Sequence, residues 1–287
     1  MDVNLHLAEP VFLRNLMVFP IRTPKSDNGI ELNSIDEILS SGSARFMELD
    51  SPEINEVVFE NRSDTPVLML DGEEITGSLQ NRIITMSGVV DARSSKNIPV
   101  VCVEGGRWQE LGKFNTGCFS YPRLRSLLTK SRYSKIDLQK TVWKEIERKL
   151  TVTRTRSMTS SMHEIYDNLQ EEISRYVEDF TGLNHNTVGL ISTAGRQILG
   201  CDIFFNNRLY KKYEFKLLRS YALDALEYMQ KGGNRDNVRT FLNALEDMLR
   251  RITFKKRNIN KVIKNNILSG QLLFHAGRMI HLSAFPV

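Results

Sequence analysis

Several features that would narrow the class of this protein are missing from its sequence. The chain has no run of about 18 apolar residues, so it predicts no membrane-spanning helix. Residues 1–4 lack the basic start that precedes the apolar core of a signal peptide. Only three cysteines are present, Cys102, Cys118 and Cys201, and their wide spacing excludes a disulfide framework or a zinc knuckle. We therefore expect a cytoplasmic protein with no membrane partner.

The sequence also lacks a Pro/Gly/Ser-rich linker and an internal repeat of fixed period. Its 287 residues are 41% hydrophobic and 25% charged, which is an ordinary globular balance with enough chain for a sizeable core. We predict a single α+β domain over residues 1–287. It is β-rich over 1–110 and mixed over 111–287, with C-terminal strands returning to the N-terminal part and helices inserted between.

Apolar runs bounded by turn residues predict the strands. These runs are Val11–Val18, Arg45–Leu49, Val57–Glu60, Val67–Leu70, Ile83–Val90, Ile98–Val103, Thr187–Phe205 with a hairpin turn at Gly195-Arg196, and Ile267–Phe285 with a turn at Gly277. The polar segment Asp91–Asn97 is predicted to be a loop.

Capping residues and helical spacing predict the helices. One helix begins at Ser34 and ends near Gly42, a second includes Val142 to Leu150, and a third begins at Ser161 and continues to Val177 with apolar residues at i, i+4. Two more are expected, from Lys216 to Met229 before Gly232-Gly233, and from Asn234 or Asp236 to Leu249.

The formal net charge of +5 is mild, and the basic residues gather in two groups, one from Arg123 through Arg125 to Lys135 and a second from Arg250 to Lys264. The second group could bind phosphate or nucleic acid. We favour a solvated helix end, because no aromatic residues interleave to form a stacking platform. Nucleic acid is therefore not the expected partner. A basic second half could also form a surface between two copies of the chain, and composition does not separate these alternatives.

Polar residues are most concentrated between Pro66 and Trp108, where three polar groups follow strand-like runs. The groups are Asp71-Gly72-Glu73-Glu74, Gln80-Asn81-Arg82 and Glu104-Gly105-Gly106-Arg107-Trp108. Hairpin pairing could bring the ends of these strands together, which is how a β scaffold builds a site.

The carboxylates of this stretch are the candidate catalytic groups. Glu73, Glu74 and Glu104 could act as general acid and base, or could hold a divalent cation together with Asp71. On a strand Glu73 and Glu74 point to opposite faces, so at most one joins Asp71. The alternatives are a solvated acidic turn for Asp71 to Glu74 and a structural ion pair of Glu104 with Arg107. The identity of a metal stays open.

The remaining polar groups are candidate ligand-binding residues. Gln80 and Asn81 supply amide donors and acceptors, while Arg82 and Arg107 can bind a phosphate or carboxylate bidentately. Trp108 offers a face for a base or sugar, although a core or rim role is commoner for tryptophan.

Thiol and imidazole groups give weaker signals. Cys102 lies among valines with no nearby histidine in the sequence, which favours a buried inert thiol over a nucleophile. His275 and His281, six residues apart, are expected on one side of the terminal hairpin and could reach the site. Two isolated histidines do not define a metal site.

The order and spacing of these blocks resemble one known family. Leu68-Met69-Leu70-Asp71-Gly72-Glu73-Glu74, Gly77, Gln80-Asn81-Arg82, Ile98-Pro99-Val100 and Cys102 to Trp108 are similar to the ADP-ribosyl-glycohydrolase and rhodanese-phosphatase-superfamily-associated domain family. The resemblance spans most of the chain. It implies processing of ADP-ribose or a related NAD-derived compound, and it implies no settled catalytic residues.

Three hypotheses follow for function. The first is an enzyme that hydrolyses an ADP-ribose-like nucleotide. The second is a non-catalytic module that binds or senses such a nucleotide. The third is a structural protein in which these polar residues form ion pairs at strand ends. Convergence of the polar groups in one concave pocket would favour the first two.

Overall fold

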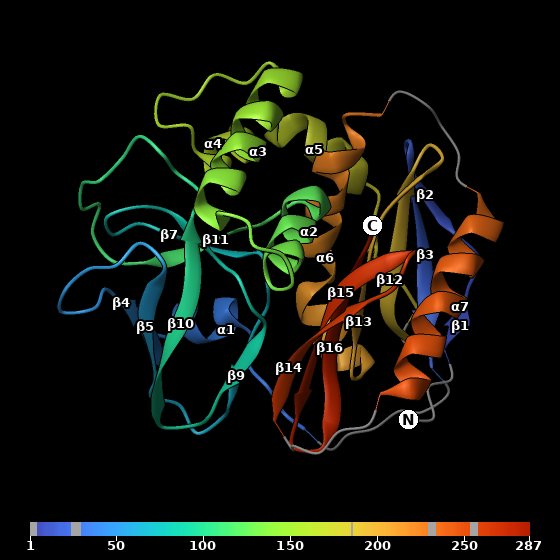
Figure 1. Ribbon diagram of the computed structural model, residues 1–287, viewed down its shortest axis with the longest axis horizontal. Helices are drawn as coiled ribbons and strands as arrows, with labels where there is room; N and C mark the ends of the chain where they lie inside the picture. The colour runs from blue at the N-terminus through green and yellow to red at the C-terminus, as the bar shows by residue number, and fades with distance from the viewer. Residues whose placement is uncertain (1–4, 24–29, 185, 229–233, 253–257) are drawn as a thin grey trace. The chain divides into compact units, whose positions relative to one another are not determined.

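The computed structural model describes residues 5–23, 30–184, 186–228, 234–252 and 258–287 (Figure 1). Its helices and antiparallel sheets confirm the predicted α+β class. The chain forms two compact units, one from residues 1–29 and 173–287 and the other from residues 30–172. No helix in the described ranges is both long and apolar enough to cross a membrane.

The first unit contains a sheet that joins both ends of the chain. Its strand order is β1-β3-β12-β13-β16-β15-β14, with β2 paired to β3. The strands are β1 (His6–Leu7), β2 (Val11–Leu13), β3 (Leu16–Arg22), β12 (Thr187–Ala194), β13 (Gln197–Phe204), β14 (Ile259–Lys264), β15 (Leu268–His275) and β16 (Arg278–Pro286). The C-terminal strands thus share a sheet with the first strands of the sequence.

Alternation along β13 sends apolar and polar residues to opposite faces of this sheet. Cys201 and Ile203 belong to the apolar core that α7 (Arg235–Arg251) covers (Figure 1). On the other face, Asp202 accepts a hydrogen bond of 2.8 Å from the hydroxyl of Tyr221 in α6 (Asn207–Ala225). The two helices therefore cover opposite faces.

The second unit contains a six-stranded sheet in the order β11-β7-β8-β10-β5-β4, and β6 pairs separately with β9. The strands are β4 (Ala44–Met47), β5 (Glu56–Asn61), β6 (Val67–Met69), β7 (Glu73–Thr76), β8 (Arg82–Ile84), β9 (Gly88–Val90), β10 (Ser94–Cys102) and β11 (Asn115–Phe119). Its helices are α1 (Ile35–Ser40), α2 (Pro122–Ser131), α3 (Leu138–Thr153) and α4 (Met162–Asn168). The boundary between the units falls within α5 (Gln170–Val177).

Strand β10 organises this sheet because it changes partner along its length. Its first part pairs with β5, from Ser94 opposite Asn61 to Pro99 opposite Glu56. Its last part pairs with β8, from Val100 opposite Ile84 to Cys102 opposite Arg82. Alternate residues of these strands fill one apolar core together with α1. The end of β10 is thereby fixed beside β8, where the predicted polar groups begin.

Several predicted boundaries are confirmed. Ser34 caps α1 with the predicted capping box, and Asn234 caps α7. The hairpin turns at Gly195-Arg196 and at Gly277 lie between β12 and β13 and between β15 and β16. The predicted Gly232-Gly233 helix end and part of the basic segment Arg250 to Lys264 lie outside the described residues.

Other predicted boundaries were wrong, because a turn or break lies within a stretch of apolar residues. Val11–Val18 is a hairpin, because Arg14 adopts a positive φ of 58° between β2 and β3. Ile83–Val90 contains two strands, β8 and β9, which have different partners. The helix predicted from Ser161 to Val177 is interrupted at Leu169, whose φ of −107° lies outside the helical region.

Two elements begin earlier in the sequence than predicted. The predicted loop Asp91–Asn97 is in part strand, since β10 begins at Ser94 and pairs with β5 through its backbone. Helix α6 begins at Asn207 rather than Lys216, because the side chain of Asn206 accepts a cap hydrogen bond from the N–H of Leu209.

The close approach of β12 and β13 generates the first prediction. A Cβ added at Gly189 would lie 2.2 Å from the carbonyl oxygen of Asp202, so Gly189→Ala must displace backbone. We expect a loss of about 3 kcal/mol in the free energy of unfolding, measured by urea denaturation. Gly88→Ala is the matched control, because its nearest neighbour is the flexible Lys96 Nζ at 3.9 Å. Equal stability of the two variants would contradict this account.

Candidate functional site

An ion pair between Glu104 and Arg107, which was the structural alternative to a catalytic Glu104, is present at the end of β10. Glu104 Oε2 accepts hydrogen bonds from Arg107 Nε at 2.9 Å and from the backbone N–H of Asn81 at 3.1 Å. Glu104 Oε1 accepts one from Thr159 Oγ1 at 3.0 Å. Arg107 Nη2 also lies 2.7 Å from Glu104 Oε2. Both oxygens of this buried carboxylate are therefore occupied by donors of the protein itself.

Arg107 connects the turn before β8 with the segment that follows β10. Its Nη1 donates to the carbonyl oxygens of Ser78 at 2.6 Å and Gln109 at 2.8 Å, and its Nη2 donates to Asn81 Oδ1 at 3.1 Å. Gln80 Nε2 donates to the carbonyl oxygen of Glu104 at 3.0 Å. A guanidinium has five donors, and here each nitrogen has a partner. The sequence-predicted residues Gln80, Asn81, Glu104 and Arg107 thus meet in one network.

Burial of Glu104 disfavours its ionised form, but the hydrogen bonds from Arg107, Asn81 and Thr159 outweigh burial and lower the pKa of its carboxyl. A carboxylate that stays ionised and saturated with donors is poorly suited to proton transfer near neutral pH. Its geometry is that of a structural anchor.

Arg82 and Asp71 each take part in a buried ion pair elsewhere in this unit. Arg82 Nη1 donates to Glu48 Oε2 at 2.7 Å, and Asp71 Oδ2 lies 3.3 Å from Arg125 Nη2. The side chains of Asp71, Arg82 and Arg125 are inaccessible to solvent. Neither pairing was predicted from the sequence, since Glu48 and Arg125 are each far along the chain from their partners. The ligand-binding roles predicted for Asp71 and Arg82 stay predictions.

Neighbouring carboxylates of β7 have different partners. Glu73 Oε2 accepts from the backbone N–H of Leu70 at 2.7 Å. Glu74 Oε2 accepts from the N–H of Cys118 at 2.9 Å and lies 2.8 Å from His163 Nδ1. Cys118 Sγ in turn lies 3.9 Å from His163 Nδ1. We call Glu74, Cys118 and His163 the Glu–Cys–His cluster.

A β-bulge in β11 creates this cluster. Thr116 pairs with Ile75 and Phe119 pairs with Glu73, so Gly117 and Cys118 together oppose Glu74. Bulges of this kind re-aim a side chain and are common beside functional sites. A Cβ at Gly117 would lie 2.3 Å from Glu74 Oε2, so glycine is what lets β11 approach the carboxylate.

His163 is fixed by the first turn of α4. Its N–H donates to the hydroxyl of the N-cap residue Ser161 at 3.2 Å, and the N–H of Met162 donates to the carbonyl oxygen of Val103 at 2.9 Å. Ser161 also forms a β-bridge with Glu104. The segment after β10, which contains the Glu104 network, therefore positions the histidine.

The cluster combines a buried anion with an accessible ring. The Glu74 side chain has no exposed surface, whereas the His163 side chain is 33% exposed and Cys118 is partly exposed. Cys118 and then Glu74 raise the pKa of His163 to about 11, because each favours the imidazolium form. The cluster thus pairs the Glu74 side chain with the His163 ring beside the sulfur atom of Cys118.

Sequence patterns missed two of these three residues. Cys118 and His163 lie 44 and 89 positions from Glu74, and no local motif connects them. The only available signal was the scarcity of their types, three cysteines and five histidines in the chain. Within the described residues, this is the one group of three His, Cys, Asp or Glu side chains whose ligand atoms lie within 4.8 Å of one another.

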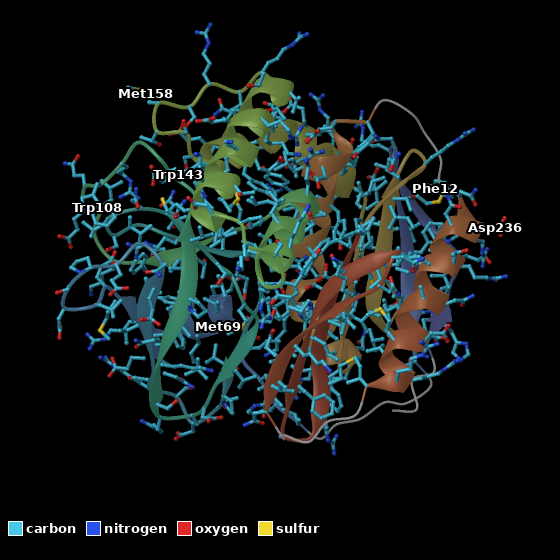
Figure 2. All side chains as sticks on the ribbon, in the orientation of Figure 1. Phe12, Met69, Trp108, Trp143, Met158 and Asp236 are labelled. Carbon is cyan, nitrogen blue, oxygen red and sulfur yellow. The ribbon has the colours of Figure 1, made fainter. Side chains whose placement is uncertain are left out.

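The remaining candidates are not members of the cluster. Trp108 is 52% exposed on the connection between β10 and β11 (Figure 2). Cys102 is buried as predicted, and burial raises the pKa of its thiol. His281 belongs to the other unit, where its Nε2 lies 3.0 Å from Asp202 Oδ1. His275 and His281 lie on β15 and β16, the two strands of the predicted terminal hairpin.

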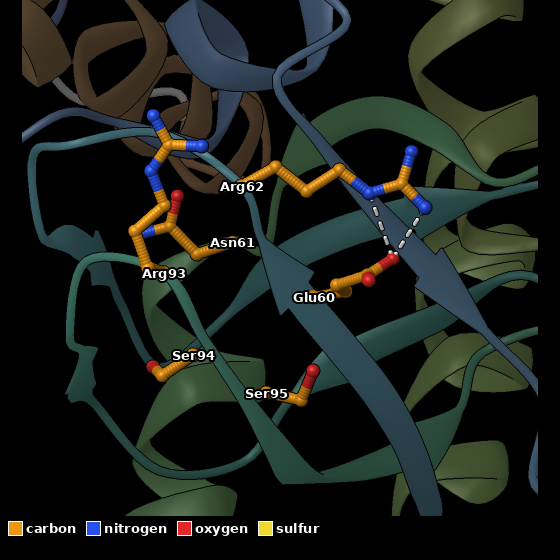
Figure 3. Close-up of a pocket in the computed structure, with 6 residues that line it drawn as sticks. All are labelled: Glu60, Asn61, Arg62, Arg93, Ser94 and Ser95. Carbon is orange, nitrogen blue, oxygen red and sulfur yellow. Dashed lines mark hydrogen bonds and ion pairs between the residues drawn. The ribbon is translucent and has the colours of Figure 1, made fainter.

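A shallow pocket of about 210 Å³ lies at the opposite end of β5 and β10, lined by Glu60, Asn61, Arg62, Arg93, Ser94 and Ser95 (Figure 3). Arg62 is paired with Glu60 at 2.6 Å, and Arg93 is paired with Asp64 at 2.8 Å. Both guanidinium groups already have carboxylate partners, so the pocket is poorly suited to an anion. It contains none of the predicted site residues.

The Glu104 network generates a stability prediction. Arg107→Ala removes the main cation from a buried carboxylate, and we expect a loss of about 3 kcal/mol in the free energy of unfolding in urea. Arg45→Ala is the control, since Arg45 pairs with Glu60 at an exposed position where Arg62 remains. A loss no larger than that of the control would contradict an anchoring role.

The same network generates a pH prediction. The pKa of Glu104 in the folded protein lies below its value of about 4.3 in the unfolded chain. The ionised side chain therefore makes its full contribution to the free energy of unfolding above pH ~4.3, and this contribution is lost as the pH falls through the folded pKa. The stability difference between the parent and Glu104→Gln should therefore shrink between pH 7 and pH 3. Urea denaturation at several pH values measures it. A difference that is constant with pH would contradict this assignment.

Comparison with known proteins identifies a family. Residues 4–285 match the family model ARPP-1, described as the ARG and Rhodanese-Phosphatase-superfamily-associated Protein domain. No curated protein and no solved structure matches the chain. The match covers both units and confirms the coarser part of the family resemblance.

Proposed function

We propose that this protein, which belongs to the ARPP-1 family, is a hydrolase acting on ADP-ribose or a related NAD-derived nucleotide. The family description associates the domain with ARG and rhodanese-phosphatase superfamily proteins. Taking ARG as ADP-ribosyl-glycohydrolase, as the resemblance implies, directs the proposal to ADP-ribose chemistry. This is an argument from association, and the chemistry must come from the site.

One observation carries the enzymatic part of the proposal: a carboxylate, a thiol and an imidazole converge at a partly exposed place in the Glu–Cys–His cluster. These groups come from β7, β11 and α4, three elements that are far apart in the sequence. Stability of the core does not require these three groups to lie together where solvent reaches them. An active site does require polar side chains that converge on a rigid scaffold.

Hydrolysis needs an activated water molecule and a stabilised leaving oxygen. Two chemistries fit the cluster. In one, His163, held in place by Glu74, gives a proton to the leaving group. In the other, the three side chains hold a cation on which water is activated. Both place Glu74 at the reaction, and both leave Glu104 as a positioning residue through its contact with the start of α4.

The substrate would approach the connection between β10 and β11. That connection begins beside Glu104 and ends at β11, which carries Cys118. Trp108 lies on it with half of its surface free to stack on a base. The side chains of Gln80, Asn81 and Arg107 form hydrogen bonds with other groups of the chain, so in this proposal they shape the connection. Glu73 and Asp71 stabilise the turn before β7.

The test is turnover of ADP-ribose and NAD, followed by liquid chromatography with mass detection. We expect the parent to consume at least one compound, and Glu74→Gln to lower kcat at least about 100-fold, as loss of a catalytic acid–base group does. Glu9→Gln is the control, because Glu9 is exposed in the other unit.

Equal turnover by folded Glu74→Gln would overturn the site assignment. Binding of either compound with no conversion, seen as a raised melting temperature, would favour the non-catalytic sensing alternative.

A further inference from the structure

We propose that Glu74, Cys118 and His163 form a zinc-binding site with three protein ligands. The donors are a carboxylate oxygen, a thiolate sulfur and an imidazole nitrogen, which are the three ligand types that zinc uses in proteins. Sites with three protein ligands keep a fourth position for water.

The distances between the donors suit a tetrahedral ion. With the usual zinc–ligand bond lengths, neighbouring donors lie ~3.3 to 3.6 Å apart. Here Glu74 Oε2 and His163 Nδ1 are 2.8 Å apart, Cys118 Sγ and His163 Nδ1 are 3.9 Å apart, and all three ligand atoms lie within 4.8 Å of one another. Small side-chain rotations would therefore complete the geometry.

A second observation comes from the buried carboxylate. Glu74 Oε2 has donors, but Glu74 Oε1 is equally buried and has no hydrogen-bond donor in the described part of the chain. A buried carboxylate oxygen without a partner is costly. A cation bound through Oε2 at the cluster would compensate the charge of this carboxylate, which is shared with Oε1.

The scaffold holds the ligands before any ion binds. The bulge at Gly117-Cys118 presents the thiol opposite Glu74, and Ser161 fixes the turn that carries His163. The hydroxyl of Tyr166 in α4 donates to the carbonyl oxygen of Phe119 in β11, which joins the two elements directly. Preorganised ligands lose less entropy on binding a metal.

The surroundings fit an open site. His163 is one-third exposed, so water can reach a fourth position, and His163 Nε2 lies 3.9 Å from Asp167 Oδ1. Metal-bound histidines commonly direct their second nitrogen to such a carboxylate. Magnesium and calcium are poor candidates, because they prefer oxygen ligands over thiolate and imidazole.

The experiment uses the full chain after treatment with a chelator. Titration with Co²⁺ should give tetrahedral visible bands and a near-ultraviolet thiolate-to-cobalt band, and Zn²⁺ should abolish both at one equivalent per chain. Mg²⁺ should not. Cys118→Ser should lose the thiolate band, and His163→Ala should weaken Zn²⁺ binding at least about 10-fold. Cys201→Ala, a cysteine of the other unit, is the control and should bind as the parent does.

Absence of stoichiometric binding by the folded parent would overturn the proposal, as would an unchanged thiolate band in folded Cys118→Ser. Circular dichroism establishes folding of each variant. Any use of the ion to activate water rests on the proposed function, but binding does not. Zinc binding without hydrolysis would overturn only the proposed function, and hydrolysis by zinc-free protein with no binding would overturn only the zinc site.

Discussion

The ion pair between Glu104 and Arg107 is the interaction on which the rest of the second unit's site depends. A carboxylate at the end of an apolar strand is costly unless donors surround it, and here Arg107, Asn81 and Thr159 supply them. Those donors come from the connection after β10, the turn before β8 and the segment before α4. Satisfying one buried charge therefore fixes three segments that are distant in the sequence.

The consequence for chemistry is indirect. Because Ser161 bridges to Glu104, the first turn of α4 begins at a fixed place, and His163 reaches Glu74 from there. The bulge in β11 brings Cys118 to the same carboxylate from the other side, and Gly117 provides the room. The accessible cluster is thus built by backbone features and by a charge network that does not itself need to react.

Much of the fold could be predicted, because local patterns encode it. Alternation and turn residues marked the hairpin of β12 and β13, and side-chain caps marked the starts of α1 and α7. The prediction was wrong where periodicity carries no information about partners. The apolar run that contains β8 and β9 looks continuous, but its two parts pair with different strands. The polar start of β10 resembles a loop because its contribution is backbone pairing with β5.

The same distinction between local patterns and tertiary partners applies to the residues of the candidate site. The sequence indicated a Glu104–Arg107 pair because the two residues are three positions apart, and it indicated Glu74 as one carboxylate among several. It could not indicate Cys118 or His163, since only the tertiary structure brings them to Glu74. Hydrogen bonding then separates carboxylates that look alike in the sequence. Both oxygens of Glu104 are satisfied by the protein, which suits an anchor, whereas Glu74 has one buried oxygen without a donor among the described residues, beside an accessible thiol and imidazole. A buried carboxylate whose charge is incompletely compensated, beside a partly exposed ring, is where a protein can bind a cation or move a proton. This difference is the physical ground for the chemistry that we propose at Glu74 and for the anchoring role that we propose for Glu104.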